Sequence, residues 1–185
     1  LPDSETFLFG NELLDALPCE LVHRGEMAWV EGHEVSFGAM EEGAAAMAER
    51  FGITRGEVPV GLQALARSLP PLSRAESVWF DYGERSNAGE FTLRLYQQHQ
   101  VWPFFEDGLD RAALFGQSDL TYDVNFGIWE ALMGEMGWRP QAYSSQAQAM
   151  VSFGITELLE LLKQNSDKAT YLRESNKVRT LLDPQ

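Results

Sequence analysis

Two carboxylates with an amide beside them follow a short apolar run near the start of the sequence. Asn11 and Glu12 come directly after the run, and Asp15 follows three residues later. On a helical turn Glu12 and Asp15 would share one face. Such a pair can bind a guanidinium group bidentately, and it can accept a proton from an attacking nitrogen. The alternative is structural: Asn11 would cap a helix that begins at Glu12, with Asp15 beside the positive end of its dipole.

A second acidic strand end is predicted further along the chain, at Asp81-Tyr82-Gly83. These residues follow the apolar run 77–80, just as Glu12 follows the run 7–10. Ligands of α/β enzymes bind at the carboxyl ends of the sheet strands, which favours a functional interpretation of both ends. The alternative for the second is an ordinary strand end with a half-buried tyrosine, because Gly83 permits a tight turn.

Arg94, Tyr96 and His99 form a further polar cluster. A histidine can act as a base near neutral pH or support another group through a hydrogen bond, and a structural role is the alternative. Asp119 opens Asp-Leu-Thr, a combination typical of a helix cap. Cys19 is the single cysteine, so neither a disulfide framework nor a cysteine-based zinc site is expected, and we interpret Cys19 as a small packed residue.

Apolar strands and amphipathic helices are both expected to position these residues. The predicted extended segments are strands at 7–10, 77–83 and 142–148, a hairpin joining 19–24 to 27–31, an extended turn at 56–60, and a strand or helix start at 91–96. The predicted helices are 41–51, 62–69, 119–137, 155–163 and 170–182. The mixture indicates an α/β fold, and the hairpin indicates that part of the sheet is antiparallel.

The composition fits one domain with an appended tail. The chain has 185 residues, an apolar fraction of 44% and a net charge of −14. This charge argues against nucleic acid and against an anionic membrane surface as partners, and no apolar run has the length of a membrane span. It favours a basic partner through electrostatic steering, although solubility alone would also explain it.

Motifs along most of the chain resemble, in their order, the MidA family of S-adenosylmethionine-dependent methyltransferases, which includes a mitochondrial arginine methyltransferase needed for complex I assembly. The matching segments lie at 11–18, 56–58, 80–83, 89–99, 119–126, 145–146 and 154–155, and the resemblance covers about residues 5–160. The chain departs from the family pattern at Glu90-Phe91, which separate Gly89 from Thr92, at Asn125, where the family often has Asp, and at Ala149-Met150.

The resemblance implies an α/β class I methyltransferase-like (Rossmann-like) mixed sheet with an inserted hairpin and helices. Residues 1–160 would be the C-terminal part of a catalytic domain with a substrate-binding insert, and 161–185 a helical tail. The cofactor would be S-adenosyl-L-methionine. The family's glycine-rich cofactor turn lies upstream of the Asn-Glu motif, so the chain is expected to be the C-terminal portion and to bind the cofactor weakly or not at all alone. The sheet edge beside 7–10 then favours pairing with another chain, as in a homo-oligomer or dimer.

The resemblance also implies residue roles. Asn11 would bind near the amino-acid end of the cofactor, and Glu12 and Asp15 would be catalytic, binding an arginine of a basic protein substrate. The predicted substrate-channel residues are Tyr82, Arg94, His99 and Asp119. No metal is implied, and the expected compartment is the bacterial cytoplasm, or the mitochondrion in a eukaryote. The alternative is a non-catalytic protein-interaction module built on the same scaffold.

Overall fold

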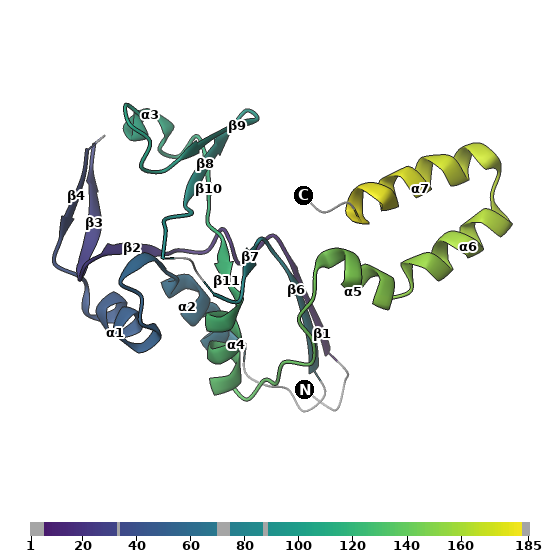
Figure 1. Ribbon diagram of the computed structural model, residues 1–185, viewed down its shortest axis with the longest axis horizontal. Coiled ribbons are helices and arrows are strands. Elements are labelled where there is room, and N and C mark those ends of the chain that lie inside the picture. The colour runs from purple at the N-terminus through teal and green to yellow at the C-terminus, as the bar shows by residue number, and fades with distance from the viewer. Residues whose placement is uncertain (1–5, 33, 70–74, 87–88, 183–185) are drawn as a thin grey trace. The chain divides into compact units, whose positions relative to one another are not determined.

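The computed structural model describes residues 6–32, 34–69, 75–86 and 89–182 (Figure 1). The chain divides into two compact units, residues 1–139 and 140–185. The first unit holds the strands together with helices α1–α4, and the second holds helices α5–α7. No helix in the described ranges combines the length and the apolar character needed to cross a membrane.

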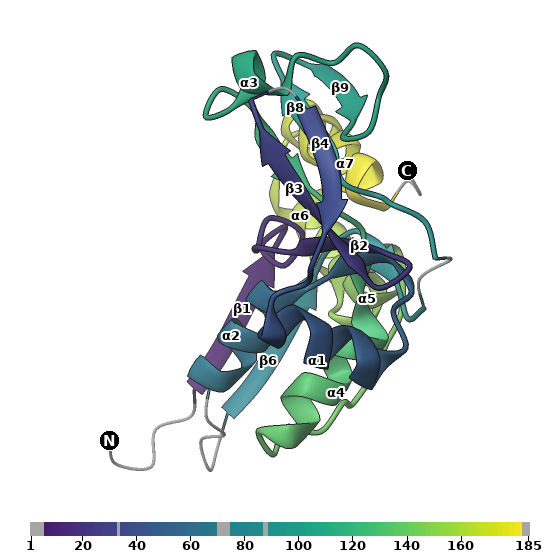
Figure 2. The same ribbon diagram turned by 90° about the vertical axis from the view of Figure 1, so that its left-hand side faces the viewer.

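Two parallel strands carry the predicted acidic ends. Strand β1 (Thr6–Asn11) pairs with β6 (Ala75–Phe80), and the register sets Asn11 opposite Phe80 (Figures 1 and 2). Because the strands are parallel, their carboxyl ends lie at the same edge, as α/β sites require. The apolar runs 7–10 and 77–80 are therefore confirmed as strands. The second strand was predicted to extend to Gly83, but it ends at Phe80.

Only one face of this strand pair is covered within the described residues. Trp79 of β6 packs edge-to-face on Trp129, with ring centroids 5.2 Å apart. On the opposite face Phe7 and Phe9 are 61% and 59% exposed. These two side chains are therefore not buried, although an apolar run such as 7–10 is typical of a buried strand. In the described part of the chain β1 pairs with β6 alone, so its second edge is unpaired.

Helices α1 (Glu42–Phe51), α2 (Val60–Ser68) and α4 (Phe126–Glu135) supply much of the main core (Figure 2). The buried residues of this core are Leu14, Val22, Met27, Ala44, Met47, Ala48, Val58, Leu62, Ala66, Val124, Ile128, Trp129, Leu132 and Met133. Helix α1 ends where Gly52 adopts φ 65°, the left-handed conformation typical of a glycine at a helix C-terminus. Leu14 lies in the turn after β1 and belongs to this core, so its buried side chain anchors the turn to the core.

An antiparallel sheet has the strand order β4-β3-β2-β5. Its strands are β2 (Glu20–His23), β3 (Glu26–Glu31), β4 (Glu34–Gly38) and β5 (Arg55–Val58). The predicted hairpin is confirmed, and it turns at Arg24 and Gly25, both with positive φ. Residues 55–58 form a strand instead of the expected extended turn, because β5 pairs antiparallel with β2.

A second antiparallel sheet has the order β10-β8-β9. It contains β8 (Arg94–Gln97), β9 (Gln100–Pro103) and β10 (Asp119–Thr121), with the short helix α3 (Arg111–Leu114) before β10. The prediction that Asp119 opens a helix was wrong, because residues 119–121 pair with β8. Helix α4 begins at Phe126 instead, where the Asn125 carboxamide accepts the Ile128 N–H at 3.1 Å.

A short parallel pair links the end of β6 to the start of α4. Strand β7 (Gly83–Glu84) pairs with β11 (Val124–Asn125). Gly83 has φ 140°, and a Cβ there would collide with the Val124 backbone. The glycine is thus required for this close approach as well as for the turn.

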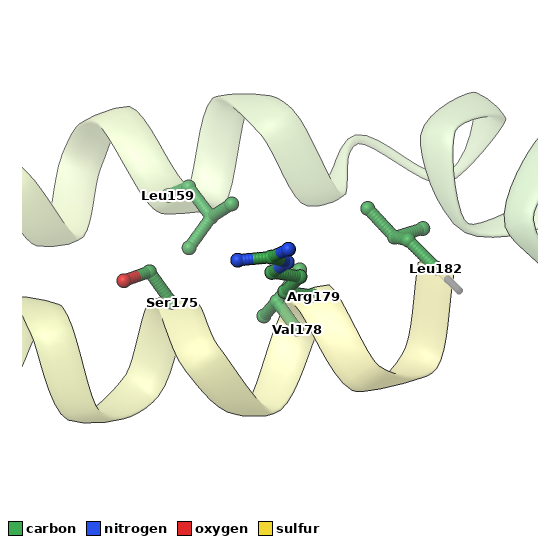
Figure 3. Close-up of a pocket in the computed structure, with 5 residues that line it drawn as sticks. All are labelled: Leu159, Ser175, Val178, Arg179 and Leu182. Carbon is green, nitrogen blue, oxygen red and sulfur yellow. The ribbon is translucent and has the colours of Figure 1, made fainter.

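The second unit consists of α5 (Gln146–Ser152), α6 (Ile155–Asn165) and α7 (Lys168–Leu182), none of which has a buried residue. The strand predicted at 142–148 was wrong: Ser145 and Gln148 form a reciprocal capping box that starts α5. Helices α6 and α7 are confirmed. They border a groove of about 320 Å³ lined by Leu159, Ser175, Val178, Arg179 and Leu182 (Figure 3).

Candidate functional site

The carboxylate of Asp81 fixes the turn that follows β1. Its Oδ2 accepts the backbone N–H groups of Leu13, Leu14 and Asp15 at 3.1, 2.8 and 3.3 Å. Its Oδ1 accepts the N–H of Tyr82 at 2.9 Å. A carboxylate that accepts several backbone N–H groups is a strong anchor, because charge-assisted hydrogen bonds exceed neutral ones. The end of β6 therefore holds the end of β1 in place.

No helix begins at Glu12, so the capping interpretation of Asn11 was wrong. The N–H groups after Glu12 are satisfied by Asp81 from the neighbouring strand, and residues 12–17 form bends and turns. Asn11 is exposed at the end of β1, and its carboxamide makes no hydrogen bond within the described residues. Its amide is thus free to meet a ligand at the carboxyl edge of the strand pair.

Glu12 adopts an unusual backbone conformation at this edge. Its φ is 48°, in the left-handed region that residues with a Cβ rarely occupy. Its N–H donates to the Phe80 carbonyl at 2.9 Å, and its Oε1 accepts the Tyr82 hydroxyl at 3.4 Å. Such a conformation costs about 1–2 kcal/mol and concentrates at functional sites. The Glu12 side chain is exposed and lies beside Tyr82.

Asp15 is the buried acid of the site. Asp15 is only 5% exposed, and its Oδ1 has no hydrogen-bond partner in the described structure. Burial, followed by the negative charges of Asp81 and Glu12, raises the pKa of Asp15 from 3.8 to about 6. A carboxyl group with such a pKa can take up and release a proton near neutral pH. The predicted catalytic residues Glu12 and Asp15 therefore lie within electrostatic reach of each other.

Tyr82 joins the two strand ends to the β8 region. Burial and the neighbouring Glu12 raise the pKa of its phenol, and Asp15 and Tyr96 contribute in the same direction. Tyr96 of β8 therefore lies close enough to influence Tyr82 electrostatically. Strand β8 therefore lies within electrostatic range of the predicted site.

The other predicted substrate residues take varied positions. Arg94 forms an ion pair with Asp123, and its Nε donates to the Thr92 carbonyl at 3.1 Å. His99 lies in the turn between β8 and β9 with φ 67°, and Asp119 lies on β10 opposite Tyr96. Within the described residues, neither His99 nor Asp119 makes a hydrogen bond to the turn at residues 12–17, which we call the acidic turn. The substrate roles of all three residues stay predictions.

Sequence reasoning missed three residues near the site. Tyr122 is 3% exposed, its N–H donates to the Asp15 carbonyl at 3.1 Å, and its hydroxyl has no partner among the described residues. Asp123 neutralises Arg94. Glu57 is buried on β5, within the family-like segment 56–58, but no role for its side chain was predicted. Tyr122 and Asp123 lie within the segment 119–137 that was expected to be helical, so the sequence assigned no site role to either.

Metal binding finds no support in the described ranges, which contain no group of three or more His, Cys, Asp and Glu side chains suited to a metal ion. The donors at the strand ends are carboxylates, an amide and a phenol. This set is suited to cationic and hydrogen-bonding ligands. It can bind a guanidinium group and accept its proton.

Comparisons with known proteins find similar sequences and structures over most of the chain. The mitochondrial protein arginine methyltransferase NDUFAF7 homologue of Caenorhabditis elegans is 25% identical over 187 residues, which cover 89% of this chain and 41% of that protein. A COG1565 superfamily protein of Burkholderia thailandensis, solved with S-adenosyl-homocysteine, matches with a TM-score of 0.72 at 20% identity, over 99% of this chain and 51% of that one. A native crystal structure of a COG1565 superfamily protein from the same organism gives a TM-score of 0.74 at 22% identity, over 99% and 53%.

The chain thus spans about half the length of the solved structures it matches, and less than half of the curated relative. These likenesses confirm the methyltransferase-like α/β fold. A family model described as "Putative S-adenosyl-L-methionine-dependent methyltransferase" matches residues 1–144. Since that match covers most of the chain, this protein belongs to that family of S-adenosyl-L-methionine-dependent methyltransferases.

Proposed function

We propose that this chain supplies the methyl-acceptor site of an S-adenosyl-L-methionine-dependent protein arginine methyltransferase. The observation that carries the proposal is the buried Asp15 carboxyl group, which has an unpartnered oxygen and lies near the exposed Glu12. The named activity of the curated relative supports an arginine substrate. The family supports the cofactor, which when bound supplies an electrophilic methyl group.

Glu12 and Asp15 would hold the guanidinium group of the substrate. Paired carboxylates bind guanidinium strongly, because two charge-assisted hydrogen bonds fix its plane. The bound positive charge lowers the pKa of Asp15 from about 6, so that Asp15 enters the complex ionised. Holding the charge on the nitrogens nearest the carboxylates leaves the remaining nitrogen more nucleophilic. As that nitrogen gains the methyl group, whose former bonding pair would stay on the sulfur of the cofactor, Asp15 would accept the proton that the nitrogen loses.

Tyr82 and Asn11 would orient the groups around this reaction. The Tyr82 hydroxyl donates to Glu12 and so restricts the rotation of the carboxylate. Asn11, exposed at the end of β1, would bind the amino-acid end of the cofactor. Positioning of this kind contributes much of the rate in a bimolecular displacement.

The substrate protein is proposed to be basic. All of the net charge of −14 belongs to residues 1–139, because residues 140–185 contain equal numbers of acidic and basic residues. A field of this sign raises the encounter rate with an arginine-rich segment at low ionic strength. Arg94, His99 and Asp119 would border the path of this segment, with Arg94 already neutralised by Asp123.

The test is methylation of an arginine-containing protein by the full-length enzyme with Glu12→Gln. This change keeps the size of the side chain and removes its charge, so we expect the catalytic rate to fall at least about tenfold. Glu26→Gln on β3, an exposed acid away from the turn, is the matched control. Methylation by Glu12→Gln at the control rate would contradict the assigned role.

A second candidate is a protein-interaction module without catalysis. The exposed Phe7 and Phe9 and the unpaired edge of β1 favour this candidate, because such surfaces bind other chains. Calorimetric titration of S-adenosyl-homocysteine into the full-length protein separates the two candidates. Absence of binding there would favour the interaction module.

A further inference from the structure

Glu57 on β5 is a buried acid that the proposed reaction does not use. It is 1% exposed, and its Oε1 accepts the N–H groups of Thr92 and Leu93 at 2.6 and 2.9 Å. Burial raises the pKa of Glu57, and the bonds from Thr92 and Leu93 oppose that rise. Removing a carboxylate from water is costly unless its hydrogen bonds repay the cost. These two bonds therefore mark a contact that the fold depends on.

The backbone of β5 is shaped for this contact. Gly56 has φ 123°, and a Cβ built there would lie 3.3 Å from the Glu90 carbonyl oxygen. The segment that leads into β8 can approach β5 closely because this position has no side chain. Glu57, the next residue, then reaches the N–H groups of Thr92 and Leu93.

A chain of hydrogen bonds continues from Thr92 to Asp123. The Thr92 hydroxyl accepts the Asp123 N–H at 2.9 Å. The Thr92 carbonyl accepts a hydrogen bond from the Nε–H of Arg94. The guanidinium group of Arg94 also forms an ion pair with the Asp123 carboxylate. The position of Asp123 is thus set by a segment that Glu57 holds.

Tyr122 and Val124, which flank Asp123 in the sequence, donate backbone hydrogen bonds to the segments that follow β1 and β6. The Tyr122 N–H donates to the Asp15 carbonyl at 3.1 Å, and the Val124 N–H donates to the Tyr82 carbonyl at 2.8 Å. Asp15 and Tyr82 are the groups proposed to bind and orient the acceptor. Every step from Glu57 to these two residues is a hydrogen bond, an ion pair or a peptide bond between adjacent residues.

We propose that Glu57 is a positioning residue for the acceptor site, acting through Thr92 and Asp123 on the backbone of Asp15 and Tyr82. The role in acceptor binding rests on the proposed function, whereas the mechanical coupling does not. Glu57 touches no substrate. It determines where the β8–β10 insert meets the strand ends.

The coupling is tested by amide hydrogen exchange on the 185-residue chain. In Glu57→Ala we expect exchange at Thr92 and Leu93 to rise at least about tenfold, and exchange at Tyr122 and Val124 to rise with it. In Glu57→Gln the amide oxygen can still accept both N–H groups, so protection should be largely retained. Glu26→Ala on β3 is the control and should change none of these amides.

A second variant keeps the test decisive if Glu57→Ala unfolds. Thr92→Val removes the acceptor for the Asp123 N–H together with the hydroxyl's own bond to Glu57, but it leaves the backbone N–H groups of Thr92 and Leu93 bound to Glu57. We expect faster exchange at Asp123, Tyr122 and Val124 with Leu93 still protected. Unchanged exchange at Tyr122 and Val124 in Thr92→Val would overturn the proposal.

Steady-state kinetics of the full-length enzyme supply the functional readout. Thr92→Val should raise KM for the acceptor protein several-fold more than it lowers kcat, and Glu57→Gln should stay close to the unmodified enzyme. Coupled exchange without arginine methylation in the unmodified enzyme would refute the proposed function and leave the coupling intact. Methylation whose KM is unaffected by Thr92→Val would refute the positioning role alone.

Discussion

Asp81 and Asp15 belong to the same small region, but their carboxylates are used in opposite ways. Asp81, at the end of β6, accepts four backbone N–H groups. Asp15, in the turn after β1, is more deeply buried and leaves Oδ1 without a partner in the described structure. A carboxylate with its lone pairs occupied stabilises a fold, whereas a buried one with an unsatisfied oxygen costs stability. The difference separates an anchoring acid from the acid that we propose to be reactive.

The largest effect is expected on stability from Asp81→Ala. The change leaves the N–H groups of Leu13, Leu14 and Asp15 without their acceptor, and we expect a loss of about 3 kcal/mol in the free energy of unfolding. Urea unfolding measures this loss. Asp81→Asn, which keeps one acceptor oxygen, should lose less. Equal stability of Asp81→Ala and the unmodified chain would remove the distinction between the two acids.

Asp15→Asn should affect activity more than stability. The variant cannot accept a proton, so methylation of an arginine-containing protein by the full-length enzyme should fall about 100-fold. The free energy of unfolding should stay the same or increase, because a buried charge is removed. Chemical denaturation of the same variant is the control. A large loss of stability with normal activity would reverse the assignment of the two acids.

The pH dependence of stability should differ between Asp15→Asn and the unmodified chain. The pKa of Asp15 is raised from 3.8 to about 6 in the folded state, so the folded state binds the proton more tightly. Its contribution to stability is complete below about pH 3.8 and is lost as the pH rises through about 6. Urea unfolding at about pH 4 and about pH 8 should therefore show a smaller decline in Asp15→Asn. Identical declines would indicate that Asp15 is not perturbed.

The smallest effect is expected from Tyr82→Phe. The hydroxyl donates to Glu12 over 3.4 Å at an exposed site, so its loss should raise KM for the acceptor about two- to tenfold. Stability should change by less than in Asp81→Ala. Tyr143→Phe in the second unit is a matched control for removal of a phenol. A loss of kcat as large as that of Asp15→Asn would mean that Tyr82 takes part in the proton transfer.

The sequence predicted the strand ends because apolar runs followed by acids have a local signature. It did not predict the bonds from Leu13, Leu14 and Asp15 to Asp81, since 66–68 residues separate the partners. Residues 119–121 were misassigned because Asp and Thr favour caps, and pairing with β8 outweighed that preference. Residues 142–148 were misassigned although Ser145 and Gln148 have the spacing of a capping box.

The large sequence separation between Asp81 and its hydrogen-bond partners also determines when the acidic turn can form during folding. Its partners are distant in sequence, so a nascent chain cannot close the turn locally, and loop closure must come first. The turn should therefore appear late in folding, after β6 has docked beside β1. A nascent chain already contains Glu12 and Asp15 once β1 has emerged, but the turn that holds them becomes ordered only when residues up to Asp81 are free to fold.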